Sequence, residues 1–133
     1  MPINGYAQYQ QNQLATAPPA KLLLAAYDGA IRFCRIGLET MKEARIDEQS
    51  TNLNKALALV CELLATLNEE ANPQLVARLR SLYLYVIEKI AHGNLNADES
   101  AVTEAINILS SLRESWAEAD RILQRDAMQE EAA

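Results

Sequence analysis

The sequence predicts an all-α protein, an antiparallel up-and-down four-helix bundle with a flexible N-terminal arm. Three observations favour this fold class. The chain of 133 residues is 50% hydrophobic but has only 4 glycines and 4 prolines, a composition typical of a helical domain. Large apolar residues recur in steps of three and four along four successive segments, the spacing of one helix face. Short polar links join these segments, so each helix is expected to return beside the previous one.

The first helix is expected from about Pro18 to near Arg45. Two consecutive prolines stand at its start, where a missing N–H costs little because first-turn donors have no intrahelical partner. Gly29 inside the helix costs roughly 1 kcal/mol relative to alanine, which predicts that another helix approaches closely there. The apolar stripe of this helix consists of Leu23, Tyr27, Ala30, Cys34, Gly37 and Met41.

The second helix is expected from about Glu48 to Glu70, with Asp47 as its N-cap. The Asn-Pro pair at 72–73 is an N-cap followed by a first-turn proline and opens the third helix, which Gly93 is expected to stop. The apolar stripe of the second helix consists of Leu53, Leu57, Val60, Leu64 and Leu67, and that of the third consists of Val76, Leu79, Tyr83, Val86 and Ile90.

The fourth helix is expected to begin between Asn96 and Asp98, where an Asx cap and Glu99 suit the positive end of the helix dipole. Beyond Arg125 the tail is expected to fray. We therefore divide the chain into an arm at 1–17, a four-helix bundle at 18–125 and a frayed tail at 126–133. The stripe of the fourth helix consists of Val102, Ala105, Leu109, Leu112, Trp116, Ala119 and Leu123.

The net charge and the hydropathy of the sequence argue against several classes of function. The net charge of -6 works against binding nucleic acid or an anionic membrane, since both require clustered Lys and Arg. No apolar run approaches the roughly 20 residues of a membrane span, and the polar N-terminus lacks a signal-peptide pattern. We therefore expect a cytosolic protein. Cys34 and Cys61 lack the paired spacing of a zinc or redox motif, so both are expected to be buried, reduced thiols.

The residue types of known catalytic and metal sites are missing from the pattern. A di-iron bundle needs two Glu-x-x-His pairs, but the chain has one histidine, His92. His92 lies at a helix end, so it fits a surface pair or a helix-dipole partner better than a ligand. There is no glycine-rich phosphate loop and no nucleophile elbow. We expect no enzyme, no metal and no cofactor.

The predicted helices carry more apolar residues than the stripes of a four-helix bundle need. This surplus must line a groove or be covered by the arm. Its members are Leu22, Ile31, Phe33, Leu59, Leu63, Leu75, Leu82 and Tyr85.

With these residues in place, nearly the whole chain resembles the FliS family, the flagellin-specific export chaperones of flagellar type III secretion. Its Tyr-Asp-Gly run together with a late tryptophan is the most specific feature, and the order and spacing of the motifs add to it. The motifs are Tyr6-Ala-Gln-Tyr-Gln-Gln-Asn-Gln, Thr16-Ala-Pro, Leu-x-x-x-Tyr27-Asp-Gly-Ala, Asn52-Leu-x-Lys-Ala, Leu82-Tyr-x-Tyr, Ala91-His-Gly-Asn and Leu112-Arg-x-x-Trp.

The resemblance implies a cytosolic chaperone that binds the disordered C-terminal segment of flagellin in an apolar groove. It also implies that binding prevents premature polymerisation and aids delivery to the export apparatus. An Ile and a Tyr in the family's N-terminal segment are implicated in client binding, and Ile3 and Tyr6 match that pair. The expected client-binding residues are Ile3, Tyr6, Tyr9, Leu14, Leu22, Tyr27 and Asp28.

Some alternatives stay open at this point. Tyr27 lies on the core stripe, where a packed aromatic with a hydrogen-bonded hydroxyl is an equally good interpretation, and Asp28 could be a surface carboxylate. Further partners implied by the family are an export gate component, a co-chaperone or an anti-sigma factor. Ala25 and Ala26 replace a bulkier pair common in the family, which would alter the groove. Other classes are a self-associating bundle or, through His92, a phosphotransfer module.

Overall fold

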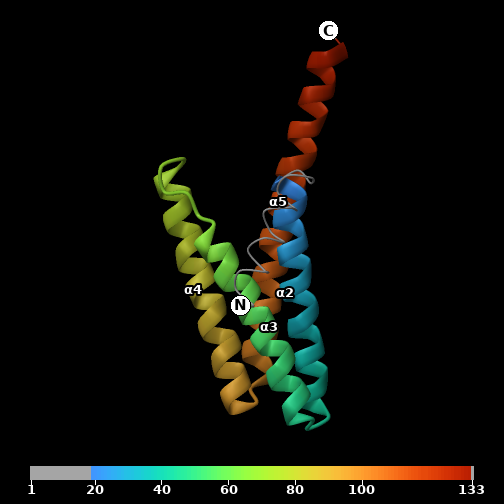
Figure 1. Ribbon diagram of the computed structural model, residues 1–133, viewed down its shortest axis with the longest axis vertical. Coiled ribbons are helices and arrows are strands. Elements are labelled where there is room, and N and C mark those ends of the chain that lie inside the picture. Colours follow the sequence, from blue (N-terminus) through green and yellow to red (C-terminus); the bar gives the residue numbers. More distant parts are fainter. Residues whose placement is uncertain (1–18, 133) are drawn as a thin grey trace, which may run out of the picture.

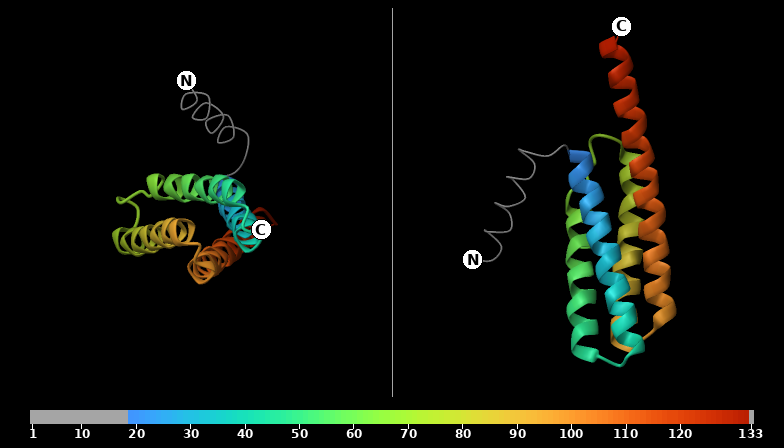
Figure 2. Two further views of the ribbon diagram at one scale, coloured as in Figure 1. Left: turned by 90° about the horizontal axis from the view of Figure 1, so that it is seen from below. Right: turned by 90° about the vertical axis from the view of Figure 1, so that its right-hand side faces the viewer.

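The computed structural model describes residues 19–132, and within that range it contains four helices and no strand. The helices are α2 (Pro19–Lys42), α3 (Ile46–Ala65), α4 (Pro73–Asn96) and α5 (Glu99–Ala132). They alternate in direction, and α2 packs on α3 and α5, while α4 packs on the same two helices from the other side (Figure 2). The predicted all-α, up-and-down four-helix bundle is confirmed.

The buried core follows the predicted stripes of α2, α4 and the first half of α5. Fully buried side chains include Tyr27 on α2, Ile90 on α4 and Leu109 on α5. On α3, Leu53 and Val60 are buried as predicted. Two further buried residues, Ala56 and Leu63, each lie one position before the predicted Leu57 and Leu64. The remaining residues of the predicted stripe are half-buried, because α3 turns its apolar face toward two neighbours; they are Leu57, Leu64 and Leu67. The helix ends at Ala65 and not near Glu70 as expected, so Leu67 lies in the link to α4.

The link between α2 and α3 differs from the prediction. Helix α3 begins at Ile46, and its N-cap is Arg45, which makes no side-chain capping bond. Asp47 therefore does not cap the helix but lies in its first turn, where its charge still suits the helix dipole. The turn is made by Ala44 with a φ of 58° and by the backbone of Arg45, whose N–H donates to the Thr40 carbonyl at 2.8 Å.

Two of the predicted helix caps are confirmed. The Asn72 side chain accepts a hydrogen bond from the Leu75 N–H at 3.2 Å and opens α4 ahead of Pro73. At the start of α5, the Asp98 carboxylate accepts from the N–H groups of Ser100 and Ala101 at 3.1 and 3.3 Å. These side chains satisfy donors that a helix N-terminus otherwise leaves unpaired.

Gly93 was expected to stop the third helix, but α4 continues past it to Asn96 and ends at Ala97, which has a left-handed φ of 50°. Gly93 is buried instead at a close contact with α5. A Cβ at this position would lie 2.6 Å from a methyl group of Val102, shorter than a carbon–carbon contact allows. The glycine therefore permits the approach of α5 rather than ending α4.

The bundle is tight at one end and open at the other. Figure 1 shows α3 and α4 diverging from α2 and α5 toward the α3–α4 link. Side chains at that end of the inner face, such as Leu23, Leu67 and Trp116, are only half-buried, whereas Met41, Leu53 and Ile90 nearer the tight end are buried. The helices thus leave apolar surface uncovered at the open end.

Helix α5 projects beyond the bundle (Figure 2) and extends to Ala132. Residues 126–132, which belong to the predicted frayed tail at 126–133, are helical and exposed in the structure. The physical reason is local, because alanine, methionine, glutamine and glutamate are among the strongest helix formers and supply six of these seven residues.

The two cysteines have different environments. Cys34 is fully buried on α2, and burial raises the pKa of its thiol to about 12. Cys61 is exposed, contrary to the expectation that both thiols are buried, because the buried stripe of α3 passes through its neighbour Val60. Within residues 19–132, no helix combines the length and apolar character that crossing a membrane requires.

Candidate functional site

A buried hydrogen-bonded network crosses the bundle just below its open end. The hydroxyls of Tyr27 on α2 and Tyr83 on α4 lie 2.5 Å apart, and the Trp116 indole N–H from α5 donates to the Tyr27 hydroxyl at 3.0 Å. The two tyrosine rings are tilted, with centroids 6.3 Å apart. The network therefore connects three helices, two of which are not direct neighbours in the bundle, and it satisfies polar groups that burial would otherwise leave unpaired.

The tyrosine pair predicts a loss of stability at alkaline pH. Burial, the largest cause, raises the pKa of both Tyr27 and Tyr83 above the ordinary value of about 10. Folding favours the neutral phenols. The contribution of this pair to the free energy of unfolding should therefore be constant below pH about 10 and should fall as the pH rises above that value. Urea unfolding at increasing pH checks this. The double variant Y27F/Y83F should lose stability less steeply; an equal slope would contradict the assignment.

Trp116 also lines an apolar hollow at the open end of the bundle, between the start of α2 and the projecting part of α5. The hollow has a volume of about 250 Å³, and Leu123 beside it is exposed. We call it the open-end groove; its lining consists of Ala20, Leu23, Trp116, Ala119, Asp120 and Leu123. Asp120 is the one charged residue of the lining. An apolar side chain that enters the groove would therefore be transferred from water to a mainly apolar surface, which is favourable.

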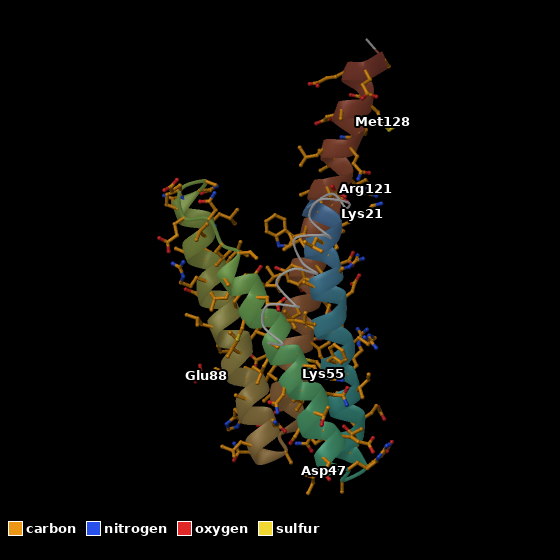
Figure 3. The ribbon with its side chains drawn as sticks, viewed as in Figure 1. Lys21, Asp47, Lys55, Glu88, Arg121 and Met128 are labelled. Carbon is orange, nitrogen blue, oxygen red and sulfur yellow. The ribbon has the colours of Figure 1, made fainter. Side chains whose placement is uncertain are left out.

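A second hollow, of about 400 Å³, lies on the outer surface between α2 and α3, and we call it the α2–α3 groove. Phe33 of α2 and Leu59 of α3 are its large apolar residues. The close helix crossing predicted at Gly29 is confirmed here, because a Cβ at Gly29 would lie 2.9 Å from a Leu59 methyl group. The guanidinium of Arg32 lies 4.6 Å from the Phe33 ring centroid. The lining consists of Phe33, Lys55, Ala58, Leu59 and Glu62, and Figure 3 shows Lys55 on α3.

The expected client-binding residues have different environments. Leu22 is half-buried on α2, and Tyr27 is fully buried in the network. Asp28 is exposed, and its carboxylate accepts a 2.9 Å hydrogen bond from the Arg113 guanidinium on α5. The other expected residues lie outside the described range; they are Ile3, Tyr6, Tyr9 and Leu14.

The apolar surplus predicted a groove, but not its composition. Ile31 and Leu63 belong to the buried core and are therefore not surplus, since α2 buries a wider face than a single stripe and Leu63 lies on the buried stripe of α3. The alanines Ala20, Ala58 and Ala119, which make the two grooves shallow depressions rather than ridges, were not identified as groove residues. Small residues beside half-buried large ones on a helix surface are the signal that would have found them.

Groups suited to metal or phosphate chemistry do not gather in either groove. Within residues 19–132 there is no set of three or more His, Cys, Asp or Glu side chains placed to hold a metal ion. His92 lies at the tight end, where its Nε2 is 3.3 Å from the Asp98 carboxylate and its Nδ1 is 3.1 Å from the Asn96 amide. Fold and site thus define a class: a four-helix bundle whose apolar grooves flank one helix.

The comparisons with known proteins identify the family within that class. A family model described as flagellar protein FliS matches residues 2–123, so the chain belongs to the FliS family. The flagellar secretion chaperone FliS of Bacillus subtilis (strain 168) is 29% identical over 123 residues, covering 92% of this chain and 91% of the relative. The family is thus one of chaperones, not of enzymes.

Two further proteins agree with this assignment. The flagellar secretion chaperone FliS of Campylobacter jejuni (subsp. jejuni serotype O:6, strain 81116) is 30% identical over 113 residues, covering 85% of this chain and 88% of the relative. A solved structure, a crystal structure of a flagellar chaperone from bacteria, superposes with a TM-score of 0.73 at 20% identity, covering 91% of this chain and 98% of that chain. At that identity the structure confirms the fold alone.

Proposed function

We propose that this protein is a cytosolic export chaperone that binds the disordered C-terminal segment of flagellin and delivers it to the flagellar export apparatus. The observation that carries the proposal is the pair of apolar grooves on either side of α2, in a chain of the FliS family. A client segment running across α2 would contact both grooves. Its burial would also prevent premature polymerisation.

The physical form of the grooves suits a client that folds as it binds. Such a client must offset its ordering entropy by burying a long apolar surface, on the order of 1,000 to 3,000 Å². Two shallow grooves separated by one helix supply an extended surface instead of a deep pocket. Alternating leucines of an amphipathic client helix could occupy each groove in turn, as in other helix-in-groove complexes.

The expected client contacts divide into two sets under this proposal. The arm residues Ile3 and Tyr6 would act at the open-end groove, because the arm joins α2 at Pro19, beside Ala20 in that groove. Leu22 is half-buried on α2 and does not line that groove, so it would contact the client beside it. Tyr27 is buried, so its contact with a client would require α2 and α5 to separate. Its role in the proposal is to hold Trp116 at the groove.

Charged substitutions of exposed alanines test the proposal without removing core packing. A58E in the α2–α3 groove and A119E in the open-end groove should each weaken binding of the flagellin C-terminal segment by at least about tenfold, because each carboxylate would be desolvated without a partner. The matched control is A77E on the outer face of α4, where the side chain is exposed and binding should be unchanged.

Trp116 is the only tryptophan in the chain, so its fluorescence reports on the open-end groove during the titration. The wild type and A77E should show the same saturable change, with A58E and A119E shifted to higher client concentrations while their urea unfolding midpoints stay close to that of the wild type. If all three variants bound the segment as tightly as the wild type, the grooves would not be the binding surface.

A further inference from the structure

A polar hollow on the outer surface between α2 and α5 belongs to neither apolar groove. Its volume is about 520 Å³, and three arginines line it, Arg32, Arg35 and Arg113. The half-buried Ile36 adds apolar surface to the lining. We call it the arginine hollow. Its full lining is Asp28, Ile31, Arg32, Arg35, Ile36, Ser110, Arg113 and Glu114.

The charges of the hollow are unevenly distributed. Both of its carboxylates lie near Arg113, which donates to Asp28 at 2.9 Å and lies 3.4 Å from Glu114. Arg32 and Arg35 are exposed, and no ion pair joins either of them to a carboxylate in the part of the chain that the structure describes. They are three positions apart on α2, so their side chains leave the helix on the same side. Two guanidinium groups are thus left for a ligand of negative charge.

The arginine hollow borders the α2–α3 groove. Arg32 lines the hollow, and its guanidinium lies 4.6 Å from the centroid of the Phe33 ring, which lines that groove. The Lys55 ammonium from α3 lies 5.5 Å from the same ring centroid. Positive charge therefore continues from the hollow to the groove, in a chain whose net charge is -6. A client segment in the α2–α3 groove that crosses the outer face of α2 would reach the hollow.

An ion pair bridges the two helices at one end of the hollow. Two contacts join the Asp28 carboxylate on α2 to the Arg113 guanidinium on α5, at 2.9 and 3.5 Å. Such a bridge favours a chain that ends in the hollow over one that continues along the seam between the helices. The end of a chain carries a carboxylate, whose two oxygens can accept hydrogen bonds from two guanidinium groups at once.

We propose that the arginine hollow binds the C-terminal carboxylate of the client segment. This inference rests on the function proposed above, whose client is itself a C-terminal segment. Arg32 and Arg35 donate to the carboxylate, and the hydroxyl of Ser110 supplies a further donor. The side chain of the client's last residue contacts Ile36. Capture of a chain terminus is one of the recurring modes of peptide recognition.

Removing the charge of the client's terminus tests this assignment. Calorimetric titration of the full chain compares the flagellin C-terminal segment that ends in a free carboxylate with the same segment ending in a carboxamide. We expect the amide to bind at least roughly tenfold more weakly, because it loses the charge-assisted hydrogen bonds to the guanidinium groups. This difference in affinity should shrink as the salt concentration rises.

The variant R35Q removes one guanidinium group of the hollow. Arg35 is the better choice for this test because Arg32 also contacts Phe33 of the α2–α3 groove. R35Q should weaken binding of the free acid by roughly tenfold and binding of the amide by less than about threefold, because the two changes remove the same interaction. The matched control R78Q removes an exposed arginine of α4 and should leave the affinity for both forms unchanged.

The outcomes separate this inference from the function on which it rests. Equally tight binding of the acid and the amide would leave the chaperone function in place and overturn the terminal site. A loss of affinity in R35Q that is equal for the two forms would place another client group at Arg35 and would overturn it too. If neither form binds, the chaperone function fails and the terminal site fails with it.

Cross-linking checks the position of the terminus separately from affinity. In a C61S background, which removes the exposed thiol, S110C should form a disulfide on mild oxidation with a client segment whose one cysteine is its last residue. The control S111C lies about 100° further around α5, is exposed and does not line the hollow, so it should not cross-link. Equal cross-linking of the two variants would contradict the proposed position of the terminus.

Discussion

Replacing Tyr27 by alanine is expected to lower the free energy of unfolding by about 3 to 5 kcal/mol, as the loss of a fully buried aromatic ring generally does. The ring is 0% exposed, and its hydroxyl is the acceptor for Trp116 as well as the partner of Tyr83. The loss is a large fraction of the 5 to 15 kcal/mol that stabilises a typical domain. Urea unfolding followed by circular dichroism measures it.

The conservative variant Y27F separates the ring from its hydroxyl. It keeps the packing but leaves the Tyr83 hydroxyl and the Trp116 N–H without their partner, so we expect a loss of about 1 to 3 kcal/mol. The matched control is Tyr85, because its hydroxyl donates to the Glu104 carboxylate at the surface and Y85F should cost less than about 1 kcal/mol. If Y27F cost no more than Y85F, the buried network would not contribute to stability.

Replacing Gly93 by alanine is expected to destabilise the bundle by about 1 to 3 kcal/mol, the usual cost of overpacking a core. The new Cβ would lie 2.6 Å from a Val102 methyl group and 3.2 Å from the Asp98 carbonyl oxygen. Valine is stiff about χ1 and the carbonyl belongs to the backbone, so neither can yield cheaply. Thermal or urea unfolding of the variant measures the loss.

Gly29 provides the matched control for this substitution. It is also helical, so G29A gains the same helix propensity of about 1 kcal/mol. Its Cβ would meet only a terminal methyl group of the half-buried Leu59, at 2.9 Å, which a change of side-chain rotamer can move. We expect G29A to remain within about 1 kcal/mol of the wild type. A G93A variant as stable as G29A would show that α4 and α5 do not meet as closely as described.

The spacing of apolar residues predicted the four helices and most of the core, because a 3.6-residue period directly encodes which face is buried. It could not predict the Tyr27–Tyr83 bond. These residues are 56 positions apart and lie on non-adjacent helices, so their meeting depends on how all four helices pack. The structure shows Tyr27 as a packed aromatic residue with a hydrogen-bonded hydroxyl, and its expected contact with a client stays a prediction.

The errors have local physical causes. Gly93 fits a C-terminal stop by residue type, but only the position of Val102 shows that it serves close packing. Cys61 is exposed because the buried stripe of α3 includes Val60 but not the next residue. The spacing of apolar residues does not resolve a difference of one position. The surplus of apolar residues indicated that grooves exist, whereas their positions depend on how far the helices diverge at the open end.

Calorimetric titration of this protein with the C-terminal segment of its own organism's flagellin, at several temperatures, tests the central claim most directly. Coupled folding onto the two apolar grooves predicts saturable binding near one to one with a negative heat-capacity change, since apolar surface is buried. The A58E/A119E double variant should bind at least about a hundredfold more weakly if the two effects are additive. Absence of binding heat at every temperature, with no change in Trp116 fluorescence, would contradict the chaperone function proposed here.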